Sequence, residues 1–494
     1  MSNADSQTIT APSVPDTDIV LANHPEIPLF VASIPLSILV ALLSLNVFIF
    51  GGDAVSGSNQ VILMFSAAIT TAIASFYNVS WKEIESGITQ SLKIALPAML
   101  ILLMVGALSG TWLLSGIIPT MIYYGLHIMD ASWFLASAVI ISAIVAIFTG
   151  SSWTTSATIG IALMGIGQVL GVSPGLIAGA VISGSYFGDK MSPLSDTTNL
   201  AAATTGTELF THIRYMMVTT VPSITIALII FAFLGISAAQ GDSLGAEAIA
   251  QTLDASLNIT PWLLLVPLAV LVMVVRKVPA LPAIFVGVLL GAIFALIFQP
   301  EQVARIGGNG DFALYKGIMM ASFGDIEIVT GDAMLDSLLS SSGISGMLGT
   351  IWLIMSSMTF GGAMEASGFL QRITTALMSR ARSVTGLIGT TAGTCLFSNT
   401  TTSDQYLAIV VPGRMFADTY KERGLAPQNL SRTLEDTGTV TSVLVPWNTC
   451  GAYHASVLGV ATMSYAPFAF FCLISPLMTM AAAATQYKMA KLER

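Results

Sequence analysis

Runs of about 20 mostly apolar residues recur from residue 27 to near the end of the chain. Each run is long enough to cross the hydrocarbon core of a bilayer as a helix. Hydrophobic residues make up 54% of the 494 residues and charged residues only 9%, whereas soluble domains carry about a quarter charged residues. The chain is therefore predicted to be an all-α, polytopic integral membrane protein whose first partner is the lipid bilayer. No basic patch suggests binding to nucleic acid.

Two pairs of shorter apolar segments are interrupted by polar tips, TGSSWTT (149–155) and SNTTTSD (398–404). Unpaired backbone is tolerated at membrane depth only inside protein or beside water. We therefore predict two re-entrant helical hairpins, at 133–171 and 384–416, and about ten transmembrane helices. With the N-terminus inside, nearly all Lys and Arg residues lie on the cytoplasmic side, as the positive-inside rule expects. Both termini are then cytoplasmic, and the polar segment 1–26 is predicted to be a disordered tail.

The two halves of the chain resemble each other at a nearly constant offset of about 250 residues. The pairs that carry this resemblance are Gly110 and Gly362, Phe148 and Phe397, and Pro193 and Pro446. Five spans per half is an odd number, so the second copy must be inverted, an arrangement common in secondary transporters. The predicted boundaries are 27–238 for the first inverted repeat, 239–259 for an external linker and 260–494 for the second repeat.

Each repeat contains a predicted helix with polar residues at its centre. The segment GDKMSPLSDTTN falls in the middle of 174–201, and VPWNTCG falls in the middle of 433–459. Pro193 and Pro446 cannot continue a helix without losing a backbone hydrogen bond, and Gly188 and Gly451 permit unusual backbone angles nearby. Both helices are therefore predicted to break near the membrane midplane. Such breaks expose carbonyl groups that suit cations and N–H groups that suit anions.

The two breaks and the two hairpin tips are expected to converge on one site for a cation and protons. Oxygen ligands suit an alkali cation, and carboxylates buried in a membrane mark ion or proton paths. The predicted cation- and proton-coupling residues are Asp189, Asp196, Asp404, Glu435 and Asp436. The predicted Na⁺ ligands are Asp189, Ser195, Asp196, Asn199, Asn399 and Asp404. Further predicted substrate- or ion-binding residues are Ser151, Ser152, Thr154, Lys190, Ser195, Thr197, Thr198, Asn199, Ser398, Asn399, Thr400, Asn448 and Thr449.

Structural roles remain open for several of these residues. Single hydroxyl groups such as those of Ser152 and Thr197 can simply cap helix ends. Lys190 can pair with either neighbouring aspartate, which neutralises an empty site or forms a plain structural salt bridge. The segment from Thr433 to Asp436 also fits a helix-start capping pattern.

Three segments resemble the NhaC family of Na⁺/H⁺ antiporters. GDKMSPLSDTTNLA is similar to the family signature, EDTGTVTSVLVPWNTCGAY to its second-half motif, and RKVPALPAIFVGVLLG (276–291) to a further family segment. Ser398-Asn399-Thr400 matches the hairpin tip of dicarboxylate carriers in the larger ion-transporter superfamily, whereas Gly150-Ser151-Ser152 departs from it. The resemblance implies an elevator-type carrier, a homodimer, in a bacterial-type cytoplasmic membrane. It also implies two candidate activities: Na⁺/H⁺ antiport, and exchange of organic acids of the malate/lactate type.

The charge of the predicted site favours Na⁺/H⁺ exchange over organic acid exchange. Several carboxylates face one fixed cation, Lys190, and no arginine is placed to clamp an organic acid. Carboxylates that hold either Na⁺ or H⁺ are what an exchanger requires. An ion channel is disfavoured because re-entrant hairpins do not form a continuous polar path. The sequence contains no nucleotide-binding motif and no catalytic constellation, so we expect a transporter without cofactors rather than an enzyme.

Overall fold

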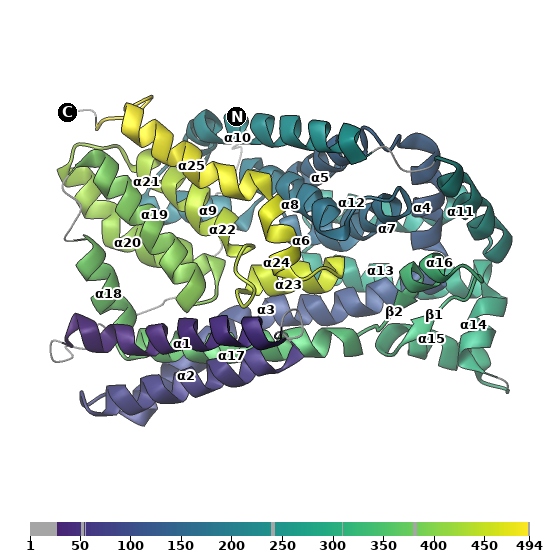
Figure 1. Ribbon diagram of the computed structural model, residues 1–494, viewed down its shortest axis with the longest axis horizontal. Coiled ribbons are helices and arrows are strands. Elements are labelled where there is room, and N and C mark those ends of the chain that lie inside the picture. Colours follow the sequence, from purple (N-terminus) through teal and green to yellow (C-terminus); the bar gives the residue numbers. More distant parts are fainter. Residues whose placement is uncertain are drawn as a thin grey trace, which may run out of the picture.

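The structure is a computed structural model that describes residues 27–50, 54, 56–238, 243–308, 310–378 and 383–492. The predicted disordered tail, 1–26, lies outside the described residues. Nearly all of the described chain is helical, and many of the helices run along the long axis of the molecule (Figure 1). The exception is a small antiparallel sheet in which β1 (Ile326–Glu327) pairs with β2 (Ser340–Ser341).

The first half of the chain extends from helix α1 to helix α11. Its helices are α1 (Leu29–Phe50), α2 (Ser58–Ser75), α3 (Trp81–Leu114), α4 (Ile117–Ile128), α5 (Phe134–Thr149), α6 (Ser152–Thr155), α7 (Ile161–Val169), α8 (Pro174–Met191), α9 (Asp196–Thr205), α10 (Leu209–Ala238) and α11 (Ser243–Ser256). A π-helical turn, Ser156–Gly160, joins α6 to α7. The predicted external linker, 239–259, thus contains helix α11.

The second half repeats much of this order. Its helices are α12 (Leu265–Val275), α13 (Ala280–Phe298), α14 (Pro300–Gly307), α15 (Ala313–Phe323), α16 (Ala333–Leu338), α17 (Leu348–Ala366), α18 (Phe369–Met378), α19 (Val384–Thr401), α20 (Gln405–Glu422), α21 (Pro427–Leu434), α22 (Val440–Ser442), α23 (Thr449–Leu458), α24 (Thr462–Tyr465) and α25 (Phe470–Thr485). A π-helical turn, Glu435–Thr439, joins α21 to α22. Helices α11 and α14–α16 gather at one end of the molecule, and α18 and the C-terminal end lie at the other (Figure 1).

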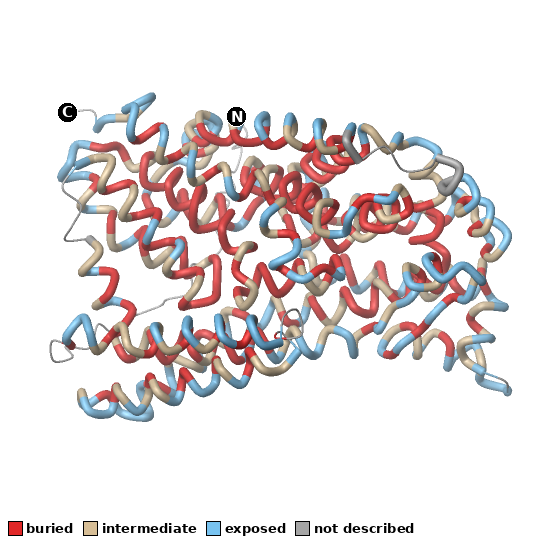
Figure 2. Tube along the Cα trace, viewed as in Figure 1, coloured by how far each residue is buried: buried red, intermediate tan, exposed pale blue. Residues whose placement is uncertain are grey.

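The chain is a multi-pass membrane protein. Among the described residues, six helices (α1, α2, α3, α10, α13 and α17) are long and apolar enough to span a bilayer, and bent pairs of helices bring the number to eight. The two broken helices are not among these candidates, so the total of about ten spans stays a prediction. Outward-facing side chains on α13, such as Phe285, Leu289 and Ile293, are about half exposed, which fits contact with lipid. Figure 2 shows buried residues concentrated in the helices between these outer ones.

Two pairs of antiparallel helices have polar residues at their turns. In the first, α5 ends at Gly150, whose φ of 67° lies in the left-handed region that glycine tolerates best, and α6 begins at Ser152. In the second, α19 extends to Thr401 and α20 begins at Gln405. Ser398, Asn399 and Thr400 therefore lie in the last turn of α19, whereas the sequence placed them in a loop.

The helical hydrogen bonding is interrupted at both prolines. Helix α8 ends at Met191 and α9 begins at Asp196, while α22 ends at Ser442 and α23 begins at Thr449. The expectation that neighbouring glycines adopt unusual backbone angles was wrong, because neither Gly188 nor Gly451 has a positive φ. These glycines permit close approach instead. A Cβ atom at Gly188 would lie 2.3 Å from the carbonyl oxygen of Ala143 on α5.

We predict that Gly188→Ala destabilises the protein by about 1–3 kcal/mol, because the added methyl group overpacks the contact between α5 and α8. The measurement is the apparent melting temperature of the purified protein in detergent. Gly393→Ala on α19 is the matched control, since a Cβ atom there meets nothing within 4 Å. Equal melting temperatures for the two variants would contradict the proposed role of Gly188.

Candidate ion-binding site

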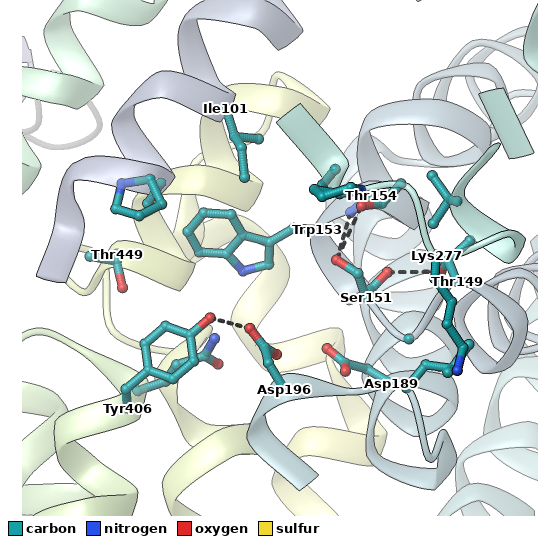
Figure 3. A pocket seen from close by; sticks show the side chains of 18 of the residues that line it. Ile101, Thr149, Ser151, Trp153, Thr154, Asp189, Asp196, Lys277, Tyr406 and Thr449 are labelled. Atoms are coloured by element: carbon teal, nitrogen blue, oxygen red, sulfur yellow. Dashed lines mark hydrogen bonds between the residues drawn. The ribbon is translucent and has the colours of Figure 1, made fainter. Parts of the chain in front are cut away.

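The turns and the breaks of both halves line one cavity of about 620 Å³ (Figure 3). Its wall is formed by the middle of α3, the turns of both helical pairs, both breaks and the segment between α12 and α13. The predicted site residues that line it are Ser151, Thr154, Asp189, Asp196, Asp404 and Thr449. The structure therefore brings three of the predicted carboxylates to one cavity.

Asp189 joins the first turn to the first break. The carboxyl atom Oδ2 accepts hydrogen bonds from the backbone N–H of Ser152 at 2.9 Å and from its hydroxyl group at 2.7 Å. The other oxygen, Oδ1, has no hydrogen-bond partner among the described residues, although only 5% of the residue is exposed. A buried carboxylate with a free oxygen is suited to hold a proton or a cation.

The other two carboxylates of the cavity are Asp404, at the second turn, and Asp196, at the first break. Asp404 caps α20, because its Oδ1 accepts hydrogen bonds from the backbone N–H groups of Tyr406 and Leu407. Asp196 accepts a hydrogen bond of 2.5 Å from the hydroxyl group of Tyr406. Tyr406 thereby connects the two halves of the chain across the cavity, as the dashed line in Figure 3 shows.

The second turn and the second break are joined by backbone and amide hydrogen bonds. The side chain of Asn448 donates to the carbonyl oxygen of Asn399 at 3.0 Å, and Thr449 donates its backbone N–H to Ser403 at 2.9 Å. Trp447 donates its indole N–H to the carbonyl oxygen of Thr400 at 2.8 Å. Each turn is thus attached to the break of its own half.

Side chains of the protein already accept some of the free backbone N–H groups at the helix N-termini around the cavity. At three of them a side chain already accepts the backbone N–H: Ser151 from Thr154, Ser195 from Thr198, and Asn448 from Cys450. Asp404 does the same for α20. Among the described lining residues, the buried polar atoms without a hydrogen-bond partner are Oδ1 of Asp189, an acceptor that suits a cation or a proton, and the indole N–H of Trp153, a donor.

The other predicted site residues lie outside the cavity wall. They are Ser152, Lys190, Ser195, Thr197, Thr198, Asn199, Ser398, Asn399, Thr400, Glu435, Asp436 and Asn448. Of the six predicted Na⁺ ligands, only Asp189, Asp196 and Asp404 line the cavity. Among the described residues, no three His, Cys, Asp or Glu side chains are grouped closely enough to form a metal cluster. All six Na⁺ ligands stay predictions.

Lys190 pairs with Asp436 and not with Asp189 or Asp196, so the expected partner was wrong. Both side chains are fully buried. Asp436 also accepts hydrogen bonds from the hydroxyl groups of Thr219 on α10 and of Ser475 and Thr479 on α25. This buried ion pair therefore joins the first half of one broken helix to the other broken helix and to two further helices.

Glu435 is buried beside this pair, and neither of its carboxyl oxygens has a hydrogen-bond partner of ordinary geometry among the described residues. The capping interpretation of Thr433–Asp436 was wrong, because α21 begins at Pro427 and continues into the π-helical turn that contains Glu435. The turn places Glu435 in the interior of a helix. Its role as a proton carrier stays a prediction.

Comparison with known proteins identifies the family. Residues 184–485 match the model of the Na⁺/H⁺ antiporter family. The chain is 38% identical to the Na⁺/H⁺ antiporter NhaC of Alkalihalophilus pseudofirmus over 90% of its own length and 93% of that protein. The chain belongs to the Na⁺/H⁺ antiporter family.

Other members of this family carry different names. The chain is 34% identical to the malate-2H⁺/Na⁺-lactate antiporter of Bacillus subtilis, over 84% of its own length and 87% of that protein. It is 35% identical to the arginine/ornithine antiporter ArcD of Halobacterium salinarum, over 93% of its own length and 92% of that protein. Membership of the family therefore leaves more than one kind of substrate to be distinguished by the site itself.

Sequence reasoning missed five cavity residues with polar atoms in their side chains: Thr149, Trp153, Lys277, Gln405 and Tyr406. The indole ring of Trp153 stacks on Tyr453 of α23 with ring centroids 4.0 Å apart. Tyr406 follows Asp404 by two residues, and a polar aromatic side chain beside a carboxylate at membrane depth was the available signal. Lys277 gave no such signal, because it reads as an ordinary basic residue between two predicted spans.

We predict that Lys190→Met destabilises the protein by about 3–5 kcal/mol, because it leaves the Asp436 carboxylate buried without its cation. The double variant Lys190→Met/Asp436→Leu is expected to recover most of that loss, since both charges are removed together. Melting temperatures of the purified single and double variants measure both effects. Additive losses in the double variant would show that the two side chains do not depend on each other.

Proposed function

We propose that this protein exchanges Na⁺ for H⁺ across a bacterial-type cytoplasmic membrane by alternating access, with the cavity as the site that both ions share. The observation that carries the proposal is the free Oδ1 of Asp189 in a cavity that also contains Asp196 and Asp404. Family membership and the 38% identity to an NhaC antiporter support the same activity.

The chemistry follows from competition at the carboxylates. Asp196 interacts electrostatically with both Asp189 and Asp404, so that a cation bound near any of them relieves repulsion among the three. A proton does the same by neutralising one carboxylate. Occupancy by Na⁺ and by H⁺ are then alternatives, and movement of only the occupied site across the membrane gives obligatory exchange. Ser151, Thr154 and Thr449 supply further oxygen atoms.

The architecture that we propose is a pair of inverted repeats, 27–238 and 260–494, that operates as an elevator. In support, each half contains a pair of helices with a polar turn, then a broken helix and then a closing helix. In the first half these are α5–α7, α8/α9 and α10. In the second half they are α19/α20, α21–α23 and α25. The hydrogen bonds between each turn and its break favour movement of these elements as one body. Cytoplasmic termini and a homodimer remain predictions.

A second candidate is exchange of organic acids coupled to the same ions. The relative named as a malate-2H⁺/Na⁺-lactate antiporter and the position of Lys277 at the cavity favour it. The three carboxylates in the cavity wall argue against it because they repel an organic acid, and at three helix N-termini a side chain already accepts one of the N–H groups that could bind a carboxylate. We therefore rank this activity second.

The direct test uses everted membrane vesicles from a bacterial host without antiporters of its own. Addition of Na⁺ to vesicles with an acidified lumen is expected to release the lumenal protons, as reported by a pH-sensitive dye. Asp189→Asn, which keeps the shape but cannot ionise, is expected to lower the rate about tenfold or more. Asp418→Asn is the matched control, since that side chain is 91% exposed. Retained exchange in Asp189→Asn would remove Asp189 from the mechanism.

We predict that the half-saturating concentration of Na⁺ rises as the pH falls, because protons then occupy the carboxylates that Na⁺ requires. Where protons dominate, the rise approaches about tenfold per pH unit, while the rate at saturating Na⁺ stays unchanged. Initial rates at several pH values measure both quantities. A half-saturating concentration that does not depend on pH would contradict a shared site.

The same vesicles distinguish the second candidate. Exchange is measured with Na⁺ alone, and then with malate on one side and lactate on the other. The proposed function predicts full activity with Na⁺ alone. Activity that appears only when the organic acids are present would make the second candidate correct.

A further inference from the structure

Lys277 is a basic residue in the wall of a cavity otherwise dominated by carboxylates. It lies in the segment between α12 and α13, its side chain is exposed, and it is among the side chains that line the cavity (Figure 3). Among the described residues, no ion pair involves Lys277. An ammonium group without an ion pair therefore shares the wall of the cavity with Asp189, Asp196 and Asp404.

The backbone at Lys277 adopts a conformation that favours glycine. Its φ is 65°, and the N–H groups of Lys277 and Val278 donate to the carbonyl oxygens of Val274 and Met273 at 2.8 and 3.0 Å. This pair of hydrogen bonds is the Schellman arrangement at the end of α12, in which the residue with positive φ is usually glycine. A non-glycine residue in that position carries a conformational cost.

At two other helix ends the chain has glycine in this position, although Asn78 after α2 and Gln486 after α25 form the same two hydrogen bonds without glycine. Gly171 at the end of α7 and Gly424 at the end of α20 have φ values of 78° and 68° and form the same two hydrogen bonds. At α20 the residue before the glycine is Arg423, just as Arg276 precedes Lys277. The end of α12 thus differs from these two glycine ends by having a side chain, and that side chain lines the cavity.

We propose that Lys277 is a tethered competitor of the transported cation, which weakens Na⁺ binding while the cavity is open on this side. The inference rests on the proposed Na⁺/H⁺ exchange. Lys277 lines the same cavity as the three aspartates, so its ammonium group repels a cation that enters that cavity. Because the group is exposed and its charge is screened by water and salt, the effect on affinity is modest, roughly two- to tenfold.

The variant Lys277→Gly tests the effect of the charge without straining the backbone. Glycine fits the positive φ without strain, so this substitution removes the ammonium group and leaves the end of α12 intact. We expect the half-saturating Na⁺ concentration in everted vesicles to fall roughly two- to tenfold, and to return toward the wild-type value in Lys277→Arg. Equilibrium binding of radioactive Na⁺ to the purified protein is expected to tighten in parallel.

Arg276→Gln is the matched control, because it removes one positive charge from the adjacent residue, which does not line the cavity. Its half-saturating Na⁺ concentration is expected to equal that of the wild type. The difference between wild type and Lys277→Gly is also expected to shrink when choline chloride raises the ionic strength.

Three results would overturn the inference. Unchanged Na⁺ affinity in Lys277→Gly would show that Lys277 only ends helix α12. An equal shift of the half-saturating Na⁺ concentration in Arg276→Gln would indicate a general effect of surface charge. Loss of organic-acid transport in Lys277→Gly with unchanged Na⁺ affinity would make Lys277 an anion ligand. Failure of the proposed function is distinguishable from these results, because the wild-type protein itself would then show no exchange with Na⁺ alone.

Discussion

The structure depends on the requirement that backbone polar groups inside a membrane find partners within the protein. Two helices are interrupted beside Pro193 and Pro446, and two helical pairs turn at polar segments. Side chains and neighbouring turns supply many of the hydrogen bonds that each interruption lacks. Ser195 and Asn448 cap the second halves of the broken helices, and Ser192 donates its hydroxyl group to the carbonyl oxygen of Ile147 at 2.7 Å. The polar site forms because the backbone groups at these interruptions need hydrogen-bond partners in the same place.

The same requirement determines the charge of the cavity. The interruptions bring Asp189, Asp196 and Asp404 into one wall, and these three carboxylates give the cavity its negative charge. Lys190 does not balance this charge, because Asp436 holds it in a separate buried cluster, and Lys277 is an exposed residue of the cavity wall. This division leaves Asp189 with one free oxygen atom and makes the cavity suited to exchange Na⁺ and H⁺ at shared ligands.

Much of this arrangement could be predicted from the sequence, because the signals were local. Apolar runs identify spans, and Pro193 and Pro446 between polar residues locate the breaks. Pairings between distant segments could not be read in this way. Nothing near Lys190 in the sequence indicates Asp436 as its partner, and Tyr406 becomes a site residue only when α20 is packed beside α9. The glycines were misjudged for the same reason: Gly188 and Gly451 are required by close packing, which is a tertiary property, and not by their own backbone angles.

The central claim is that Na⁺ and H⁺ occupy the same carboxylates. The most direct measurement is proton release when Na⁺ is added to the purified protein in a weakly buffered detergent solution, followed by a pH indicator and compared with choline chloride. The account predicts that Na⁺ binding releases protons, and that the release is lost in a variant in which Asp189, Asp196 and Asp404 are all replaced by Asn. Na⁺ binding without any release of protons, at pH values where the carriers exchange, would contradict it.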